Sequence, residues 1–244
     1  MEERIQGLLS QEEELRYQRQ IILHEVGLKK QELLKSAKVL VVGAGGLAAG
    51  VLPLLVGMGI GKIVVFDYDV VDTTNLSRQV QFCQEDLGKF KCQQLKKYLE
   101  KQNPNTEIIP VVQRFNKNTE PKFFQDVDVI VDACDNFQTR YAIESIAIQH
   151  KIPWVYSSVF EFQGQLSVFN YKKEIQYSDL FPNPPEEEPT TKFGKIGIMS
   201  SLPTIMGGLQ SAEVFKIVTG IGTVFDGSLM TYDLLEQDFK KLNF

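Results

Sequence analysis

Short apolar runs alternate with longer segments of helical spacing along residues 1–160 of the chain. The short runs are rich in valine and isoleucine, as strands buried on both faces are. Strands are predicted at 39–42, 62–67, 107–112, 127–131 and 153–158, helices at 88–102 and 137–150, and a short helical piece at 119–125. This alternation predicts a doubly wound, Rossmann-like, mostly parallel α/β sheet, whose ligands bind beyond the carboxyl ends of the strands.

The pattern differs on either side of this alternating region. Residues 11–35 have helical spacing with a break near Gly27. From Gln163 onward polar and apolar residues alternate, which predicts an antiparallel strand. The proline-rich stretch at 172–195 has the features of a long surface loop.

The remaining sequence predicts a helix at 202–219 and strands near 228–232 and 236–241. Gly207 and Gly208 would let this helix pack closely, and such packing favours a dimer. The C-terminal part is therefore predicted to be a mixed or antiparallel extension of the sheet, within one domain over residues 1–244.

The glycine-rich segment at 43–46 follows the first predicted strand directly. Gly43, Gly45 and Gly46 allow a tight turn beneath a phosphate, and the next helix points its first amides at that phosphate. Asp67 ends the second apolar run, where an acidic residue commonly accepts hydrogen bonds from a ribose. The turn alone indicates a nucleotide and leaves NAD and ATP both open.

Composition excludes several classes of protein. Residues 39–61 are uncharged and long enough to span a bilayer, but glycines and Pro53 interrupt them, which favours a soluble fold without a membrane segment. The acidic N-terminus shows no signal peptide. The net charge of -5 argues against nucleic acid as a partner. Cys83, Cys92 and Cys134 lack CxxC spacing, which indicates a reducing, cytoplasmic location.

Further polar motifs accompany the glycine turn. They are RYQRQIIL at 16–23, DYD at 67–69, NLSRQ at 75–79, GKFK at 88–91 and DACDNFQTR at 132–140. Together they resemble the ThiF/MoeB/HesA family, relatives of the adenylation domain of ubiquitin-activating enzymes. The resemblance extends from about residue 15 to residue 242, with the motifs in the order and spacing of the family.

The resemblance implies an adenylyltransferase. Members of the family use Mg-ATP to adenylate the C-terminal Gly-Gly carboxylate of a small ubiquitin-fold protein, such as the sulfur carriers ThiS and MoaD of thiamine and molybdopterin biosynthesis. Fixed cations and a metal suit this task, because negative charge builds around phosphorus and on the leaving pyrophosphate. The attacking carboxylate is already ionised at neutral pH and needs no general base.

The resemblance also implies a role for each motif residue. Arg78 and Lys91 contact the ATP phosphates, Arg19 reaches the neighbouring subunit's site in a homodimer, and Asp135 binds Mg²⁺. Asp67 holds the ribose, and Asp69 supports the groups around it. The other assigned positions are Asn75 and Gln79, which position phosphates or loops, and Gly43, Gly45 and Gly46 in the turn. Residues about 36–160 form the nucleotide-binding core, and about 161–244 the carrier-binding and dimer region.

Each charged residue also has a purely structural interpretation. Arg19 would be a surface arginine paired with a glutamate of its own helix, and Arg78 an ordinary loop arginine. Lys91 would be one of several lysines on a solvated helix face. Asp135 would cap the helix at 137–150, a common role for aspartate.

The sequence departs from the family at its cysteines. Many relatives bind a structural zinc with two CxxC pairs, but the first pair falls at Gln176 and Asp179, and the second, after Tyr232, also lacks cysteine. We therefore predict no zinc. Some relatives place a further cysteine in the long loop, here near Phe193, and no cysteine follows Cys134. The sequence predicts adenylation without a covalent cysteine step, after which the acyl adenylate passes to a separate sulfur donor or another nucleophile.

Two other functions stay open from sequence. An NAD-dependent oxidoreductase would share the glycine turn and Asp67 but leaves Arg19, Arg78 and Lys91 without a role. A non-catalytic homologue that binds nucleotide and a partner is suggested by the missing cysteines, although the phosphate-binding set is retained.

Overall fold

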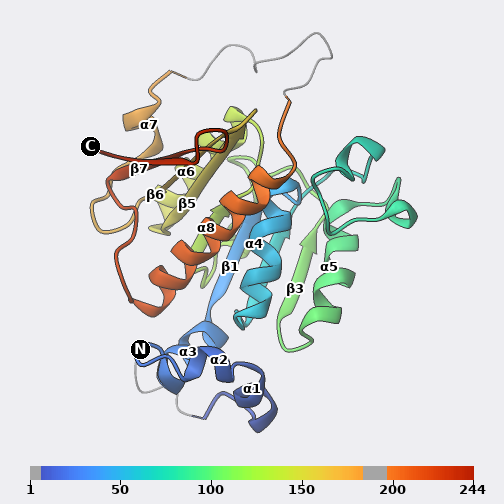
Figure 1. Cartoon of the computed structure of the whole chain (residues 1–244), viewed down its shortest axis with the longest axis vertical. Coiled ribbons are helices and arrows are strands. Elements are labelled where there is room, and N and C mark those ends of the chain that lie inside the picture. The colour runs from blue at the N-terminus through green and yellow to red at the C-terminus, as the bar shows by residue number, and fades with distance from the viewer. Residues whose placement is uncertain (1–6, 184–196) are drawn as a thin grey trace.

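The computed structural model describes residues 7–183 and 197–244, and a single mixed sheet forms the centre of this part (Figure 1). The strand order is β3-β2-β1-β4-β5-β6-β7-β8. The strands are β1 Lys38–Val42, β2 Lys62–Phe66, β3 Glu107–Val111, β4 Val129–Asp132, β5 Trp154–Phe160, β6 Gln163–Phe169, β7 Ser228–Asp233 and β8 Asp238–Asn243. Strands β1 to β5 pair in parallel, whereas β6, β7 and β8 add antiparallel strands. The predicted doubly wound α/β fold with an antiparallel extension is confirmed.

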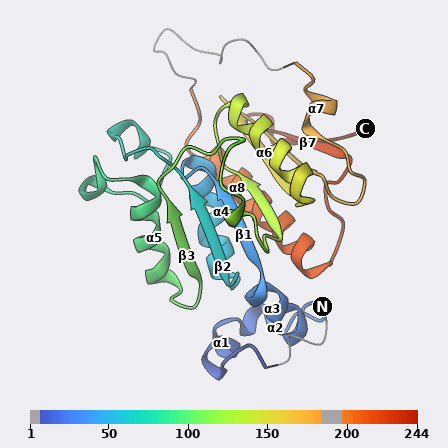
Figure 2. The same cartoon turned by 180° about the vertical axis from the view of Figure 1, so that it is seen from behind.

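Helices cover both faces of the sheet. The helices are α1 Gln11–Arg16, α2 Gln18–Ile21, α3 Gly27–Ser36, α4 Gly46–Gly57, α5 Lys91–Gln102, α6 Phe137–His150, α7 Tyr177–Leu180 and α8 Ser201–Thr219, with 3₁₀ turns η2 Thr73–Asn75, η3 Gln84–Asp86 and η4 Pro121–Phe123. Figure 1 shows α4 and α8 in front of the sheet, and Figure 2 shows α6 on the opposite face.

The central strands are apolar throughout because each face of the sheet has its own core. Val39 and Val41 of β1 belong to the core under α4 and α8, whereas Leu40 and Val42 belong to the core under α6. Successive side chains of a strand point to opposite faces, so a strand covered on both sides has no polar position. This explains the unbroken valine-rich runs of the sequence.

Helix α8 packs against α4 at two glycines. A Cβ on Gly207 would lie 2.5 Å from the carbonyl oxygen of Leu47, and one on Gly50 would lie 2.6 Å from that of Thr204. Gly207 therefore has the predicted close-packing role within this chain. A Cβ on Gly208 would meet nothing nearer than 3.8 Å, so this second glycine is not required by the contact.

The N-terminal helices α1, α2 and α3 lie at the amino ends of the strands (Figure 1). Tyr17, between α1 and α2, is buried, and its hydroxyl accepts a hydrogen bond of 2.8 Å from Nδ2 of Asn103. The predicted helical segment at 11–35 is therefore broken at Tyr17 as well as before Gly27. The side chains of Leu15 and Ile22 point to solvent, with 71% and 65% of their surfaces exposed.

Several predicted bounds differ from the structure by one or two residues, and two differences are larger. The helix expected from residue 88 begins at Lys91, because Gly88 has a φ of 76° that a right-handed helix does not allow. Helix α7 lies within the stretch at 172–195 that was predicted to be a loop. Residues 184–196 of that stretch, which include the acidic run at 186–188, lie outside the described residues.

In the described part of the chain, every helix is too short or too polar to cross a membrane. The apolar stretch at 39–61 instead supplies β1 and α4.

Candidate functional site

A cavity of about 620 Å³ opens beyond the carboxyl ends of the parallel strands. The loops that follow β1, β2, β3 and β4 all contribute to its wall. All of the residues assigned by resemblance line this cavity, with the single exception of Arg19. The position matches the expectation for ligands of a doubly wound sheet.

The turn between β1 and α4 requires glycine at Gly43. Its φ is 104°, and a Cβ there would lie 2.3 Å from the carbonyl oxygen of Ala133. The main-chain nitrogen of Gly43 donates to the carbonyl oxygen of Phe66 at 2.8 Å, which ties the turn to β2. Gly45 precedes α4 and offers no side chain to cap it, so the first amides of this helix are available to an anion.

Asp67 follows β2 and is held by two main-chain amides. Its carboxylate accepts hydrogen bonds of 2.7 Å from the nitrogens of Ala44 and Asp69. Burial raises the pKa of Asp67, and the ammonium group of Lys91 opposes the rise. Carboxylate oxygens accept more than one hydrogen bond each, so the group retains acceptor capacity for hydroxyl groups of a ligand.

Lys91 begins α5 with only 6% of its surface exposed. Its Nζ lies 3.0 Å from Oδ2 of Asp69, and its main-chain nitrogen donates to the carbonyl oxygen of Asp69 at 2.9 Å. Asp69 thus holds both the backbone and the side chain of Lys91. The interpretation of Lys91 as a solvated surface charge is wrong, because the side chain lies in the cavity wall.

Arg78 lies beside the start of α4. A Cβ on Gly46 would lie 3.8 Å from Cγ of Arg78, and Nη1 of Arg78 donates to the carbonyl oxygen of Thr74 at 2.9 Å. A guanidinium group carries five N–H donors, so this bond leaves others for an anion in the cavity.

Asn75 and Gln79 shape the loop that carries Arg78. Oδ1 of Asn75 accepts a hydrogen bond of 3.0 Å from the nitrogen of Asp72, and its carbonyl oxygen accepts from the nitrogens of Arg78 and Gln79. Gln79 is buried, and its Oε1 has no hydrogen-bond partner within residues 7–183 and 197–244. Both residues line the cavity.

Asp135 lies in the loop between β4 and α6, with its side chain exposed to the cavity. The cap of α6 is the neighbouring Asn136, whose Oδ1 accepts a hydrogen bond of 2.9 Å from the nitrogen of Thr139. The capping interpretation of Asp135 is therefore wrong. Its carboxylate is an oxygen donor of the kind that Mg²⁺ prefers, and Mg²⁺ commonly binds one or two carboxylates together with substrate phosphates.

A buried ion pair supports the loop that carries Asp135. Nε of Arg140 lies 3.2 Å from Oδ2 of Asp132, and both side chains are almost fully buried. Both side chains also bind the backbone of Cys134. Oδ1 of Asp132 accepts a hydrogen bond of 2.9 Å from the nitrogen of Cys134, and Nη2 of Arg140 donates one of 3.3 Å to the carbonyl oxygen of Cys134. Nε2 of Gln210 in α8 donates to the carbonyl oxygen of Asp132 at 2.6 Å. The backbone that precedes Asp135 is thus fixed, and Asn136, which caps α6, follows it.

The cavity also includes residues that the sequence did not single out. They include Gln113, Arg114, Arg140, Ser158 and Phe160, and also Tyr68, which was quoted only as the middle residue of the DYD motif. Arg140 belongs to the DACDNFQTR motif, and this motif is the one signal that pointed to it. Tyr68 and Arg114 follow β2 and β3 directly, and their position past the ends of parallel strands is a signal that sequence could have used.

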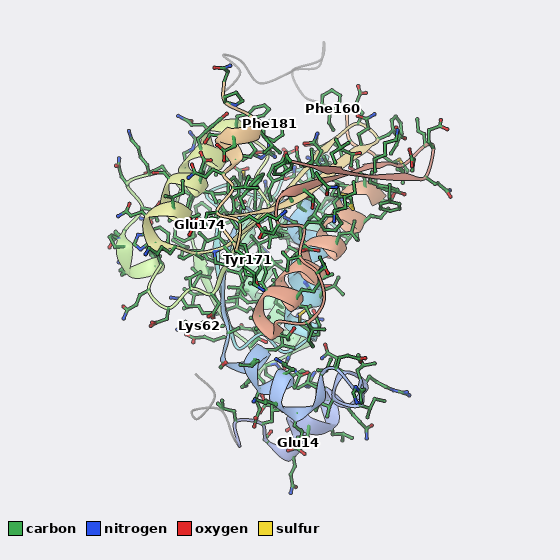
Figure 3. All side chains as sticks on the ribbon, turned by 90° about the vertical axis from the view of Figure 1, so that its left-hand side faces the viewer. Glu14, Lys62, Phe160, Tyr171, Glu174 and Phe181 are labelled. Carbon is green, nitrogen blue, oxygen red and sulfur yellow. The ribbon has the colours of Figure 1, made fainter. Side chains whose placement is uncertain are left out.

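Arg19 is exposed and lies away from the cavity of its own chain. Its helix, α2, is at the amino ends of the strands, whereas the cavity is at their carboxyl ends (Figure 1). Figure 3 shows the same separation, with Glu14 of α1 at one end of the molecule and Phe160 of the cavity wall at the other. Arg19 does not contribute to a site formed by one chain.

At the positions where many relatives have zinc-binding or loop cysteines, this chain has other residues with other contacts. The nitrogen of Gln176 donates to Oδ2 of Asp179 at 2.8 Å, an interaction that caps α7. No group of three or more His, Cys, Asp or Glu suited to a metal occurs among residues 7–183 and 197–244. The loop position near Phe193 lies outside the described residues. Burial raises the pKa of Cys134 well above its usual value, which favours the inert thiol.

Comparison with known proteins gives the family that the sequence motifs resemble, over most of the chain. The model of the ThiF family matches residues 17–244. The chain is 38% identical to the sulfur carrier protein adenylyltransferase of Thermus thermophilus, over 96% of this chain and 88% of that protein. It is also 38% identical to the adenylyltransferase and sulfurtransferase MOCS3 of Aedes aegypti, over 96% of this chain, and spans 54% of that longer protein. In structure it resembles E. coli MccB with MccA-N7isoASN, with a TM-score of 0.82 and 23% identity, covering 94% of this chain and 71% of that one.

Proposed function

The chain belongs to the ThiF family and is an adenylyltransferase, as its named relatives are, and we propose that it uses Mg-ATP to activate the C-terminal Gly-Gly carboxylate of a ubiquitin-fold sulfur-carrier protein as an acyl adenylate. The observation that carries this proposal is the cavity in which Arg78, Lys91 and Asp135 surround the glycine turn. The name of the Thermus thermophilus relative supports a sulfur carrier as the substrate.

The order of the strands supports a proposed position for each part of the reactants. Asp67 at the end of β2 would bind the ribose, and the turn after β1 would bind the phosphates. The side of the cavity formed by Asp135 and Ser158, after β4 and in β5, is then left for the carrier carboxylate. One carboxylate oxygen attacks the α-phosphorus, and the bond from that phosphorus to the pyrophosphate oxygen breaks.

Charge supplies most of the catalysis in this scheme. Arg78 and the ammonium of Lys91 would neutralise the leaving pyrophosphate, which carries the electron pair of the broken bond. Before ATP binds, the 3.0 Å ion pair with Asp69 would hold the ammonium group of Lys91 in place. When ATP binds, that ammonium group would contact a phosphate instead of Asp69. Asp135 would hold Mg²⁺, which supplies further charge neutralisation at the phosphates.

We also propose that the acyl adenylate leaves without a covalent step on this chain and reacts with a separate sulfur donor. The burial of Cys134, which raises its pKa, and the lack of any cysteine after it in the sequence support this. Mass spectrometry of the chain with Mg-ATP and carrier tests it. A carrier adduct on any cysteine that thiols reverse would rule the proposal out.

Pyrophosphate exchange tests the function itself. Exchange of labelled pyrophosphate into ATP should require a carrier that ends in Gly-Gly and should stop when that terminus is removed. ATP binding without exchange, with every carrier tried, would favour the non-catalytic homologue. Binding of NADH in place of ATP would favour the oxidoreductase.

Residues 161–244 are our proposed carrier-binding region. Phe162 and Leu235 have 40% and 67% of their surfaces exposed. The nitrogen of Leu234, the residue before Leu235, donates to the carbonyl oxygen of Phe162 at 2.9 Å, which joins the two segments. They adjoin Phe160, which lines the cavity. An apolar surface beside the mouth suits a folded protein whose tail enters the cavity.

We predict that Phe162→Ala and Leu235→Ala each raise the KM for the carrier by about ten-fold, the loss of one well-buried interface contact. The KM for ATP should stay unchanged, because neither residue lines the cavity. Ile148→Ala is the control, since Ile148 is a similarly exposed apolar residue on α6. Equal effects of all three substitutions, or an unchanged carrier KM, would contradict this surface.

In a homodimer, Arg19 of one subunit could reach the cavity of the other subunit. We propose that Arg19 completes the cavity of the second subunit, because its helix α2 lies at the end of the subunit opposite the cavity (Figure 1). The exposed Leu15 and Ile22 beside it offer apolar surface for the contact. Sedimentation should show a dimer at micromolar concentration.

Mixing two inactive variants tests this arrangement. We predict that Arg19→Ala and Arg78→Ala proteins, unfolded together and refolded, recover about one quarter of wild-type exchange, because half of the dimers are mixed and one of their two sites has both arginines. Each variant refolded alone is the control and should stay inactive. No recovery in the mixture of two inactive variants would mean that Arg19 acts within its own chain, and an active Arg19→Ala protein would mean that Arg19 has no role in exchange.

A further inference from the structure

Tyr68 and Arg114 form a fixed pair on the wall of the cavity. Nη2 of Arg114 donates a hydrogen bond of 2.7 Å to the hydroxyl of Tyr68, and the guanidinium carbon lies 4.8 Å from the centre of the ring. Tyr68 has 47% of its surface exposed, and both residues line the cavity. The ring is therefore held in one orientation while much of it is uncovered.

The backbone on each side of the pair is also fixed. Tyr68 stands between Asp67 and Asp69, and the nitrogen of Asp69 donates to Oδ1 of Asp67 at 2.7 Å. Arg114 precedes Phe115, which is buried and packs edge-on against Phe66 with ring centres 5.3 Å apart. Each side chain of the pair thus extends from a segment anchored to the core.

The strand order places this pair where a nucleobase would lie. Phe66 of β2 is paired with Val111 of β3, so Tyr68 and Arg114 follow strands that end side by side. With the phosphates after β1 and the ribose at Asp67 after β2, the base extends toward β3. On that side Tyr68 is the aromatic residue of the cavity wall with an exposed ring, since Phe66 and Phe115 are buried.

We propose that the nucleobase of ATP stacks on the ring of Tyr68 and that Arg114 holds this ring in position. The inference rests on the proposed function and adds a determinant of nucleotide affinity to it. A purine has a large flat face, and stacking on an aromatic ring together with a nearby guanidinium stabilises it. The contact involves the base alone, so it makes no difference to a ligand that lacks one.

Equilibrium binding of ATP and of inorganic tripolyphosphate to the full chain tests this. Tyr68→Ala should weaken ATP binding by about ten-fold, within the range measured for loss of one base–aromatic stack, and leave tripolyphosphate binding unchanged. Tyr68→Phe keeps the ring and should bind ATP almost as wild type does. Arg114→Ala should weaken ATP binding by about three-fold, because the ring loses its fixed orientation.

Tyr98→Ala is the matched control, since Tyr98 is exposed to a similar extent, 42%, on α5 outside the cavity wall. Unchanged ATP affinity in Tyr68→Ala would overturn the proposal, as would equal losses for ATP and tripolyphosphate. A Tyr68→Phe variant as weak as Tyr68→Ala would also overturn it, because the hydroxyl and not the ring would then matter. In these cases wild-type protein still binds ATP and supports exchange, which separates them from failure of the proposed function.

Discussion

Arg78→Ala is expected to lower the rate of ATP–pyrophosphate exchange by at least about 100-fold, the usual cost of removing one preorganised donor that stabilises charge in the transition state. Cγ of Arg78 would lie 3.8 Å from a Cβ on Gly46, the first residue of α4, where a phosphate would meet the helix amides. Its one hydrogen bond within the described residues goes to the carbonyl oxygen of Thr74, so its removal leaves no buried charge behind. The effect should therefore fall on the reaction and not on the fold.

Initial rates of pyrophosphate exchange and thermal unfolding, measured on the same samples, separate these two effects. Lys122→Ala removes the same charge from an exposed ion pair with Glu120 outside the cavity and should leave exchange unchanged. Arg78→Lys should be intermediate, because an ammonium keeps the charge but not the planar fork of donors. A near wild-type rate of exchange in Arg78→Ala would contradict the proposed contact of Arg78 with the ATP phosphates.

The second large effect is expected for the buried pair of Asp132 and Arg140. Arg140→Met should lower the free energy of unfolding by about 3–5 kcal/mol, because it leaves the carboxylate of Asp132 buried without a counter-charge. Urea unfolding followed by circular dichroism measures this change. Asp132→Asn in the Arg140→Met background should restore most of the loss, since it removes the stranded charge and keeps an acceptor for the nitrogen of Cys134.

The pH dependence of the Arg140→Met variant has a definite sign. Burial raises the pKa of Asp132, and Arg140 opposes that rise, so the pKa should climb further in the variant. Folding then favours the protonated acid. The variant should be closest to wild type below the pKa of an unfolded aspartate, about 3.9, and should lose stability as the pH rises from there toward the folded-state pKa. Equal stability of wild type and variant at neutral pH would contradict the account.

Sequence predicted the parallel sheet well because its signals are local. The valine-rich runs carry their own strand tendency, and Asn136 caps α6 so clearly that the helix has the predicted bounds of 137–150. Helix α7 was not predicted, because its stabilising contacts come from residues that are distant in the sequence. Tyr177 is buried in an aromatic cluster with Trp154, and Glu144 of α6 accepts a hydrogen bond of 2.7 Å from the nitrogen of Ser178.

The residues of the candidate site also fall into those predictable from local motifs and those that depend on distant contacts. The glycine turn, Asp67, Arg78, Lys91 and Asp135 belong to short motifs, and the structure brings all of them to one cavity. The partnership of Arg140 with Asp132 could not be read from sequence, because it depends on burial. Gln210, which supports that loop, lies 78 residues from Asp132 along the chain. The link between Tyr68 and Arg114 spans 46 residues and leaves no local pattern either.

The contact between α4 and α8 bears on how such a protein can change in evolution. Gly50 and Gly207 bring the helix of the nucleotide turn against a helix from the C-terminal region, and both contribute to one hydrophobic core. We propose that the two regions form one folding unit. Substitutions in the shared interior would then disturb both regions, so a change of partner would require substitutions on the exposed surface.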